Sequence, residues 1–145
     1  MERSVIKEIK DIDKLIRQYV SDGHDPRSVF NLTQFQIVHY LLKHPGENVC
    51  QKDLEIETHL KKASITGAID SLSEKGMVRR VQSEEDRRMN YIHLTEQMLE
   101  YKQNFENRIN QLNDDITRDI DEKELDTFYH VLDRIKENIR KEGKR

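Results

Sequence analysis

The 145-residue sequence predicts a mainly α-helical fold with one small β-hairpin wing. Apolar residues recur at spacings of three and four over most of the chain, which is the period of helices with one apolar face. The segment over residues 77–94 instead holds two β-rich runs around a polar tip. Hydrophobic residues make up 34% and charged residues 37% of the chain. This balance suits long helices with solvated faces, or a core that a second copy completes.

The first predicted helix starts near residue 5 and is stopped by the Ser-Asp-Gly run at residues 21–23. A loop that contains Pro26 is expected over residues 24–31. Apolar residues at spacings of 4, 3, 4 and 3 form a stripe along one face of this helix. The stripe consists of Val5, Ile9, Ile12, Ile16 and Tyr19.

The second predicted helix has a complete start signal. Thr33 and Gln36 have the spacing of a capping box, in which each side chain satisfies a backbone N–H near the other. Leu32 and Ile37 flank them at the positions of a hydrophobic staple. The His-Pro-Gly run at residues 44–46 ends the helix, because proline cannot continue it. Its apolar stripe is Phe35, Val38, Leu41 and Leu42.

Two short helices follow in quick succession, over residues 51 to about 57 and residues 62–75. The second ends before Gly76, a residue suited to a left-handed helix cap. One of its faces is apolar with helical spacing, and the opposite face is small and polar. The apolar face is Ile65, Ala68, Ile69 and Leu72, and the small face is Ser64, Thr66, Gly67, Asp70 and Ser71.

A pair of strands is expected next. Met77–Gln82 and Met89–Leu94 are rich in Val, Ile, Tyr and Met, and the tip between them, Ser83–Arg88, has no apolar residue. Thr95 is placed to cap the following helix.

Two further helices complete the chain. The first has a continuous apolar seam from Met98 to Ile120. The second starts at the run Asp121–Glu124, because acidic residues are favourable at a helix N-terminus. Its own apolar stripe runs from Leu125 to Ile139.

Two short helices joined by a tight turn and followed by a charged hairpin are the elements of a winged helix-turn-helix, which suits duplex DNA. The face with Ser64, Thr66 and Gly67 has no bulky side chain to hold the helix away from base edges in the major groove. Taken singly, each feature is explained as solvated surface, and it is their order in the chain that favours DNA binding. Lys61 and Lys62 are placed for phosphates, and Arg87 and Arg88 lie at the wing tip.

Charge is distributed in the same sense. The net charge of the chain is −3, so the whole molecule is not a basic surface for nucleic acid. Residues 61–88 nevertheless hold seven basic and five acidic residues, whereas residues 96–126 hold ten acidic and four basic residues. A locally basic segment beside an acidic one fits one DNA-facing and one DNA-averted surface.

With these motifs the sequence resembles the MarR (multiple antibiotic resistance) regulators. The resemblance is carried by the serine- and threonine-containing helix start at 60–66, the run 70–80 with its Lys-Gly turn, the wing tip 85–88 and the Leu-Thr helix start within 92–96. The matching stretch covers residues 51–97, and the helical layout extends the resemblance over nearly the whole chain.

The resemblance implies a twofold homodimer that binds a pseudo-palindrome in double-stranded DNA, usually as a repressor. Residues 1–22 and 96–145 would be the dimerisation helices. Residues 32–95 would form the DNA-binding lobe, with the helix-turn-helix over about 50–76 and the wing over about 77–94. By the same resemblance Ala63, Ser64 and Thr66 face bases, and Asp86 orients Arg88 toward the minor groove.

The resemblance also implies release from DNA by a small molecule, often phenolic or lipophilic, in a cleft among the first, second and fifth helices. Tyr19, Phe35, His39 and Tyr101 are the candidate lining residues. The sequence departs from the family at Gly67 and Ser71, where many relatives carry arginine or another long polar residue. We therefore expect fewer direct base contacts from this helix. More of the recognition would then depend on DNA shape and on Lys62, Arg87 and Arg88.

The composition also indicates the cellular compartment in which the protein is expected. Cys50 is the only cysteine, so no disulfide forms within the chain, which favours a reducing environment. The N-terminus lacks an apolar signal-peptide core, and no apolar run approaches the roughly 20 residues of a membrane span. We therefore expect a cytoplasmic protein with no membrane partner.

No catalytic residue and no cofactor is expected, because the sequence has no phosphate loop, nucleophile elbow or paired metal motif. The six histidines lack the i, i+4 spacing of a helical metal pair, so no metal site is expected either. Two alternatives stay open. One is a DNA-binding sensor of metal or oxidant, in which Cys50 precedes a helix start. The other is a helical dimer that serves as a scaffold and binds only protein.

Overall fold

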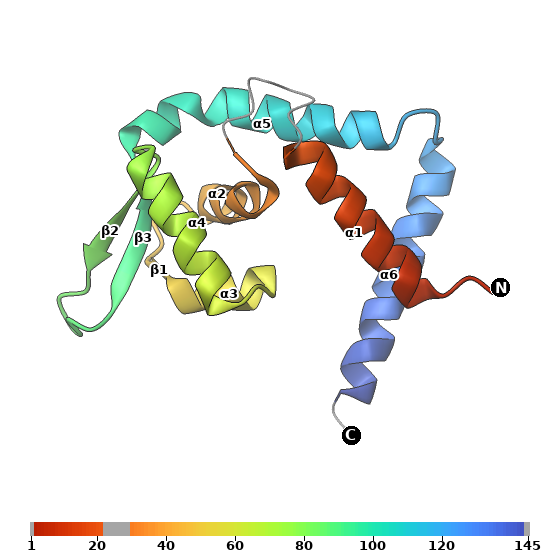
Figure 1. Cartoon of the computed structure of the whole chain (residues 1–145), viewed down its shortest axis with the longest axis horizontal. Coiled ribbons are helices and arrows are strands. Elements are labelled where there is room, and N and C mark those ends of the chain that lie inside the picture. The colour runs from red at the N-terminus through yellow and green to blue at the C-terminus, as the bar shows by residue number, and fades with distance from the viewer. Residues whose placement is uncertain (1, 22–29, 144–145) are drawn as a thin grey trace. The chain divides into compact units, whose positions relative to one another are not determined.

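A computed structural model of the chain describes residues 2–21 and 30–143 (Figure 1). The chain divides into two compact units, Met1–Asn104 and Phe105–Arg145. Residues 22–29, which include the end of the predicted helix stop and most of the predicted loop, lie outside the described residues.

The described residues form six helices and one three-stranded antiparallel sheet, which confirms the predicted fold class. Helix α5 runs across the boundary between the two units. The elements are α1 Val5–Ser21, α2 Leu32–Lys43, β1 Val49–Cys50, α3 Gln51–Thr58, α4 Lys62–Glu74, β2 Val78–Gln82, β3 Asn90–Leu94, α5 Glu96–Ile116 and α6 Glu122–Glu142.

The capping box of α2 is not the predicted one. Asn31, rather than Thr33, is the N-cap residue, and its partner is Gln34, rather than Gln36. Asn31 Oδ1 accepts a hydrogen bond from the Gln34 backbone N–H, and Gln34 Oε1 accepts one from the Asn31 N–H, both at 2.9 Å. Both pairs have the right spacing, and asparagine is among the best N-cap residues, so the earlier pair starts the helix.

The staple moves with the cap. With Asn31 as N-cap, the positions that close over the helix start belong to Phe30 and Phe35 and not to Leu32 and Ile37. The rings of Phe30 and Phe35 meet edge to face with centroids 5.8 Å apart, and both side chains are buried. This pair therefore fixes the entry of the chain into α2.

The corrected cap predicts a stability difference between two neighbouring substitutions. Asn31→Ala should lower the free energy of unfolding by about 1 kcal/mol, because the first-turn N–H of Gln34 loses its acceptor. Thr33→Ala is the matched control and should cost clearly less, since Thr33 lies inside the helix. Urea denaturation followed by circular dichroism measures both, and a larger loss for Thr33→Ala would contradict the assignment.

The C-terminus of α4 follows the sequence prediction. Gly76 adopts a φ of +75°, which an L side chain rarely tolerates. Its N–H donates to the Ser73 carbonyl at 3.0 Å, and the Met77 N–H reaches back to the Leu72 carbonyl at 2.9 Å. These two bonds are the Schellman arrangement, and they turn the chain directly from α4 into β2.

The sheet has the order β1-β3-β2. The predicted hairpin is present, with Val78 opposite Leu94 and Gln82 opposite Asn90. The two-residue strand β1 was not predicted, because a strand of this length has no periodicity of its own. It pairs with β3 through Val49 opposite Ile92 and so attaches the start of α3 to the base of the wing.

The core of the first unit lies where α2, α3, α4 and the sheet meet. Its fully buried side chains come from all of these elements, so the two short helices are held against a common apolar centre. The predicted apolar face of α4 is buried as expected. The side chains with 2% exposure or less in this region are Ile37, Val38, Leu54, Ile65, Ile69, Leu72, Val49, Val78, Ile92 and Met98.

The second unit shows one further difference from the prediction. The apolar seam continues to Ile120, but α5 ends at Ile116, and Asp119 adopts a left-handed φ of 64°. Asp121 then starts α6 through a capping box with Glu124. The apolar spacing predicted a helix as far as Ile120, because periodicity does not report where a helix stops. The capping box of Asp121 determines where the next helix begins.

Candidate nucleic-acid interface

Helix α4 presents a small, exposed face. Ala63, Ser64 and Gly67 are exposed, while the opposite face of the helix is buried in the core. A Cβ atom built on Gly67 would meet nothing within 4 Å, so the protein itself does not require glycine there. Lys61 and Lys62 are exposed at the start of the helix, where phosphate contacts are expected.

The structure places Thr66 differently from its neighbours. Thr66 is half-buried, and its hydroxyl accepts a hydrogen bond from Gln51 Nε2 at 2.7 Å. The same Gln51 nitrogen also approaches the Lys62 carbonyl at 3.4 Å. Thr66 therefore joins α4 to α3, and Gln51 is a residue of this region that the sequence analysis did not include.

The wing tip is organised by Asp86. Its carboxylate accepts hydrogen bonds from the Arg88 backbone N–H at 3.0 Å and from Arg88 Nε at 3.2 Å. These bonds hold the pKa of Asp86 below its usual value, the backbone bond first and the side-chain bond second. The pair therefore persists at neutral pH and is lost only as the pH falls through the lowered pKa. The Arg88 side chain is 92% exposed, so its guanidinium is free to meet a ligand.

A hollow of about 590 Å³ lies between the wing and the starts of α3 and α4. Four cationic side chains and two acidic ones line it, which makes it a basic recess beside the exposed face of α4. The cations are Lys52, Lys62, Arg80 and Arg88, and the acidic residues are Glu55 and Asp86.

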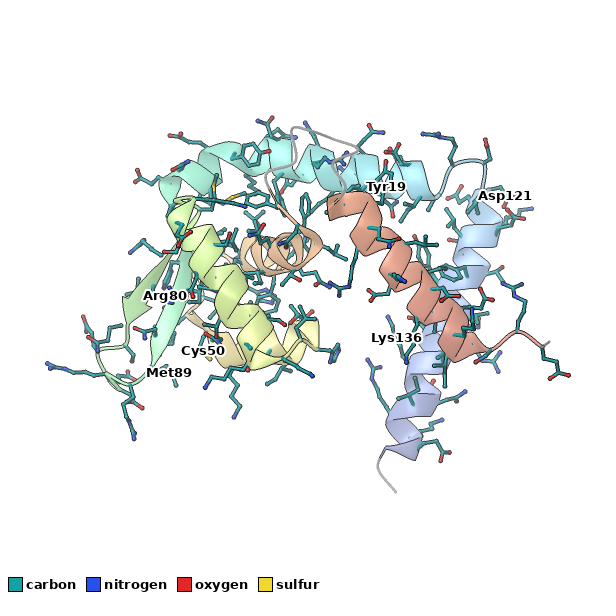
Figure 2. The ribbon with its side chains drawn as sticks, viewed as in Figure 1. Tyr19, Cys50, Arg80, Met89, Asp121 and Lys136 are labelled. Carbon is teal, nitrogen blue, oxygen red and sulfur yellow. The ribbon has the colours of Figure 1, made fainter. Side chains whose placement is uncertain are left out.

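Arg80 and Lys52 belong to this recess but were not predicted. Arg80, labelled in Figure 2, lies on β2. It forms an ion pair with Asp70 and thereby ties β2 to α4. Alternation along β2 puts Arg80 on the same face as the buried Val78, so the period of two could have indicated that it faces the helices. Lys52 gave no comparable signal, because it is one of several surface lysines at helix starts.

The predicted effector residues do not share one described hollow. Phe30 lies between two of them, with ring centroids 5.8 Å from Phe35 and 6.1 Å from Tyr101. Tyr19 is half-buried on α1. His39 is exposed and lines a separate hollow with Tyr40 and other residues of the α2 end.

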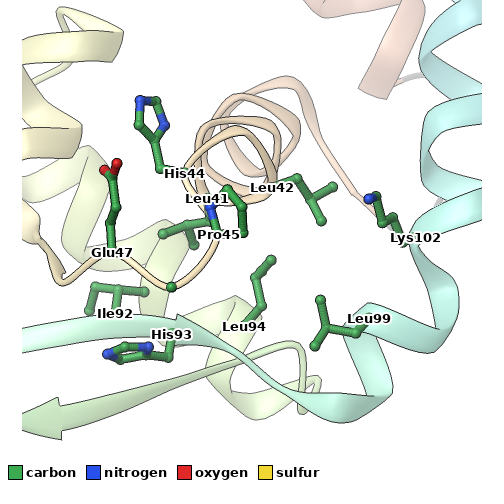
Figure 3. A pocket seen from close by; sticks show the side chains of 11 residues that line it. Leu41, Leu42, His44, Pro45, Glu47, Ile92, His93, Leu94, Leu99 and Lys102 are labelled. Carbon is green, nitrogen blue, oxygen red and sulfur yellow. The ribbon is translucent and has the colours of Figure 1, made fainter.

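A third hollow, of about 220 Å³, lies at the end of α2, beside β3 and the first turns of α5 (Figure 3). Its floor is apolar, and its rim carries a few polar side chains. The floor is formed by Leu41, Leu42, Ile92, Leu94 and Leu99, and the rim by His44, Glu47, His93 and Lys102.

Cys50 and the histidines show no ligand-binding arrangement in the part of the chain that the structure describes. The Cys50 thiol is half-buried and donates to Asp53 Oδ2 at 3.2 Å. Over residues 2–21 and 30–143, no three His, Cys, Asp or Glu side chains are grouped so that they could hold a metal ion. Among the same residues, no helix has the length and apolarity needed to cross a membrane.

Taken together, the two short helices, the Schellman turn into an antiparallel wing and the basic recess define a winged helix-turn-helix protein. Residues 30–89 match the family model described as the MarR family. Over its winged helix-turn-helix segment, the chain therefore matches the MarR family.

Solved structures share this fold along nearly the whole chain. A MarR transcriptional regulator from Methanosarcina mazei Go1 is similar at 21% identity and a TM-score of 0.79, over 94% of this chain and 96% of that one. The S. aureus MepR–DNA complex is similar at 15% identity and a TM-score of 0.80, over 94% and 99%. A MarR/EmrR family regulator from Acinetobacter sp. ADP1 gives 17% identity and a TM-score of 0.79, over 94% of both chains. At these identities the likeness concerns the fold.

Proposed function

We propose that this protein is a sequence-specific, DNA-binding transcription regulator that acts as a homodimer. In this proposal α4 enters the major groove through Ala63, Ser64 and Gly67, and the wing arginines Arg87 and Arg88 reach the adjacent minor groove. The observation that carries the proposal is the exposed small face of α4 beside a recess lined by four cations. A protein of the same fold, MepR, has been solved in complex with DNA, which supports this use of the fold.

The chemistry of the recess favours a polyanion. Lys52 and Lys62 lie at its helical side, and Arg80 and Arg88 at its wing side. Lysine and arginine neutralise phosphates and release counterions, so they supply most of the affinity that is independent of sequence. The small side chains of α4 then let the helix backbone approach base edges. In this proposal Thr66 holds α4 against α3, because its hydroxyl accepts a hydrogen bond from Gln51.

The proposal includes dimerisation through residues 1–22 and 96–145, with residues 32–95 as the DNA-binding lobe. Both terminal helices expose large apolar side chains in a single copy, which a second copy would cover. A twofold dimer presents two recognition helices about 34–36 Å apart, so it reads a pseudo-palindrome with half-sites one helical turn apart. The exposed side chains are Val5, Ile6, Ile9, Ile12 and Leu15 on α1 and Phe128, Tyr129, Val131 and Ile139 on α6.

Regulation completes the proposal. A repressor in the cytoplasm that is released by a small molecule is the mode implied by the family resemblance. The aromatic cluster of Phe35 and Tyr101 around Phe30 supports an apolar effector site at the start of α2, and Tyr19 of α1 stays a proposed lining residue. His39 would contribute to such a site only from the neighbouring hollow at the α2 end.

The direct experiment selects duplexes from a random-sequence library with the purified protein and measures binding at several salt concentrations. The proposal expects enrichment of a pseudo-palindrome and a steep fall of affinity with salt, because bound phosphates release counterions. Retention of no duplex at low salt would reject DNA binding and favour a helical scaffold that binds protein.

Arg88→Ala should weaken binding to every duplex by about tenfold and flatten the salt slope by about one charge, because one phosphate or minor-groove contact is lost. Lys123→Ala removes the same charge from α6, outside the winged helix, and serves as the control. Fluorescence anisotropy at three salt concentrations measures both variants. Equal salt slopes for Arg88→Ala and Lys123→Ala would show that the wing tip does not meet DNA.

A further inference from the structure

Gln34 connects the start of α2 to the last turns of α4. Its side chain is 3% exposed although it is polar. Gln34 Nε2 donates to Ser71 Oγ at 2.9 Å, and Gln34 Oε1 accepts from the Asn31 backbone N–H at 2.9 Å and from Lys75 Nζ at 3.3 Å. We propose that Gln34 is a positioning residue, which sets the rotation of the recognition helix against the rest of the lobe; this inference rests on the proposed function.

The chemistry of the carboxamide explains why glutamine stands here. One group must donate to Ser71 and accept from both Asn31 and Lys75, and an amide offers donor and acceptor atoms on one planar group. An apolar side chain at this buried position would leave all three partners without their bond. Satisfied buried polar groups of this kind specify one packing arrangement, because any other arrangement leaves a polar atom unpaired.

The geometry of α4 connects this contact to the DNA-facing surface. Ser64 and Ser71 are seven residues apart, which is about two helical turns, so they lie on nearly the same side of α4. Gly67 lies between them on that side. A bond to Ser71 therefore fixes the rotation about the helix axis that also turns Ser64 and Gly67 outward.

Lys75 fixes the position of α4 along its own axis. It is the C-cap residue of α4, and its ammonium group lies 5.7 Å from the centroid of the Phe30 ring, next to its bond with Gln34. The end of α4 is thereby held at the buried entry of α2. Rotation and axial position of the recognition helix are both defined at one point, about two turns from the residues that face DNA.

This placement predicts a selective defect. Base-edge hydrogen bonds require the helix in one orientation, whereas phosphate contacts by flexible lysines and arginines tolerate a small rotation. Losing the Gln34 bonds should therefore reduce the preference for the selected duplex over a scrambled duplex. Binding to the scrambled duplex and the salt slope should change little.

The test compares Gln34→Leu, Ser71→Ala and the double variant, using the duplex selected by the wild-type protein and a scrambled duplex of the same length and composition. Gln34→Leu should lower the ratio of the two affinities by about tenfold or more, with scrambled-duplex affinity within about twofold of wild type. Ser71→Ala should show part of this loss, and the double variant should be no worse than Gln34→Leu, because both changes remove one interaction.

A second readout needs no DNA. Amide hydrogen exchange in residues 71–77 should be about tenfold faster in Gln34→Leu than in wild type, while exchange in the first turns of α5 stays unchanged. If the wild-type protein selects no duplex, the proposed function fails, and this exchange measurement still judges the positioning role. An unchanged affinity ratio with unchanged exchange, equal loss of both affinities, or additive effects in the double variant would each overturn the inference.

Discussion

An Ile12→Glu variant should sediment as a single chain of 17.4 kDa under conditions in which the wild-type protein sediments as a dimer. Ile12 is 51% exposed in one copy, and its neighbour Ile9 on the same stripe is 47% exposed. Burying such side chains contributes about 1.5–3 kcal/mol each in a full interface, and a carboxylate in the same place adds an unpaired charge instead. The change should therefore act on association more than on the fold of the lobe.

Loss of the dimer should reduce affinity for the selected pseudo-palindrome by about 100-fold or more, because the second half-site no longer benefits from a linked recognition helix. Lys10→Gln shifts the net charge by the same amount on the polar side of α1 and is the control. Analytical ultracentrifugation and anisotropy measure mass and affinity together. A dimeric Ile12→Glu protein with wild-type affinity would show that the stripe of α1 lies outside the interface.

Gly67→Glu should abolish specific DNA binding while the protein stays folded. Nothing lies within 4 Å of the position that a Cβ would take, so the side chain enters solvent and not the core. Glycine is about 0.8–1.0 kcal/mol less favourable than alanine in a helix interior, and glutamate is close to alanine, so the melting temperature should not fall. A carboxylate on the exposed face of α4 repels phosphates and blocks base edges, so affinity should drop by about 100-fold or more.

Gly67→Ala separates the effect of the added charge from the effect of the added side-chain volume. It should raise the melting temperature, because the helix interior loses its glycine, and any accompanying loss of affinity reports how closely DNA approaches the helix. Differential scanning fluorimetry and anisotropy on the same samples give both quantities. Gly67→Glu binding as tightly as wild type would place DNA on another surface and reject the assignment of α4.

Two polar contacts join α4 to the helices on either side of it. Gln51 of α3 bonds to Thr66, and Gln34 of α2 bonds to Ser71. Both bonds use small hydroxyl residues of α4 as attachment points to neighbouring helices. The exposed residues Ala63, Ser64 and Gly67 are also small, which fits the proposed readout by helix orientation and DNA shape more than by long side chains.

Local patterns in the sequence were sufficient for the order of the helices and the hairpin, the buried face of α4 and the glycine turn into the wing. Each of these depends on residues within about two helical turns or on one strand pair, so periodicity and capping preferences report them directly. The motifs carried by residues 60–66 and 85–88 likewise indicated the winged helix, the segment over which the chain matches the MarR family model.

Only the tertiary structure decided between alternatives that local pattern allows equally. Asn31 and Thr33 both had a capping partner three residues on, and packing of Phe30 against Phe35 accompanies the choice of Asn31. In the sequence Arg80 is one of several cations of the wing segment, and only the structure shows its ion pair with Asp70 of α4. Gln34 showed no sign of its role, because its partner Ser71 is 37 residues away. Contacts between distant residues depend on how helices pack, and no periodicity within one helix contains that information.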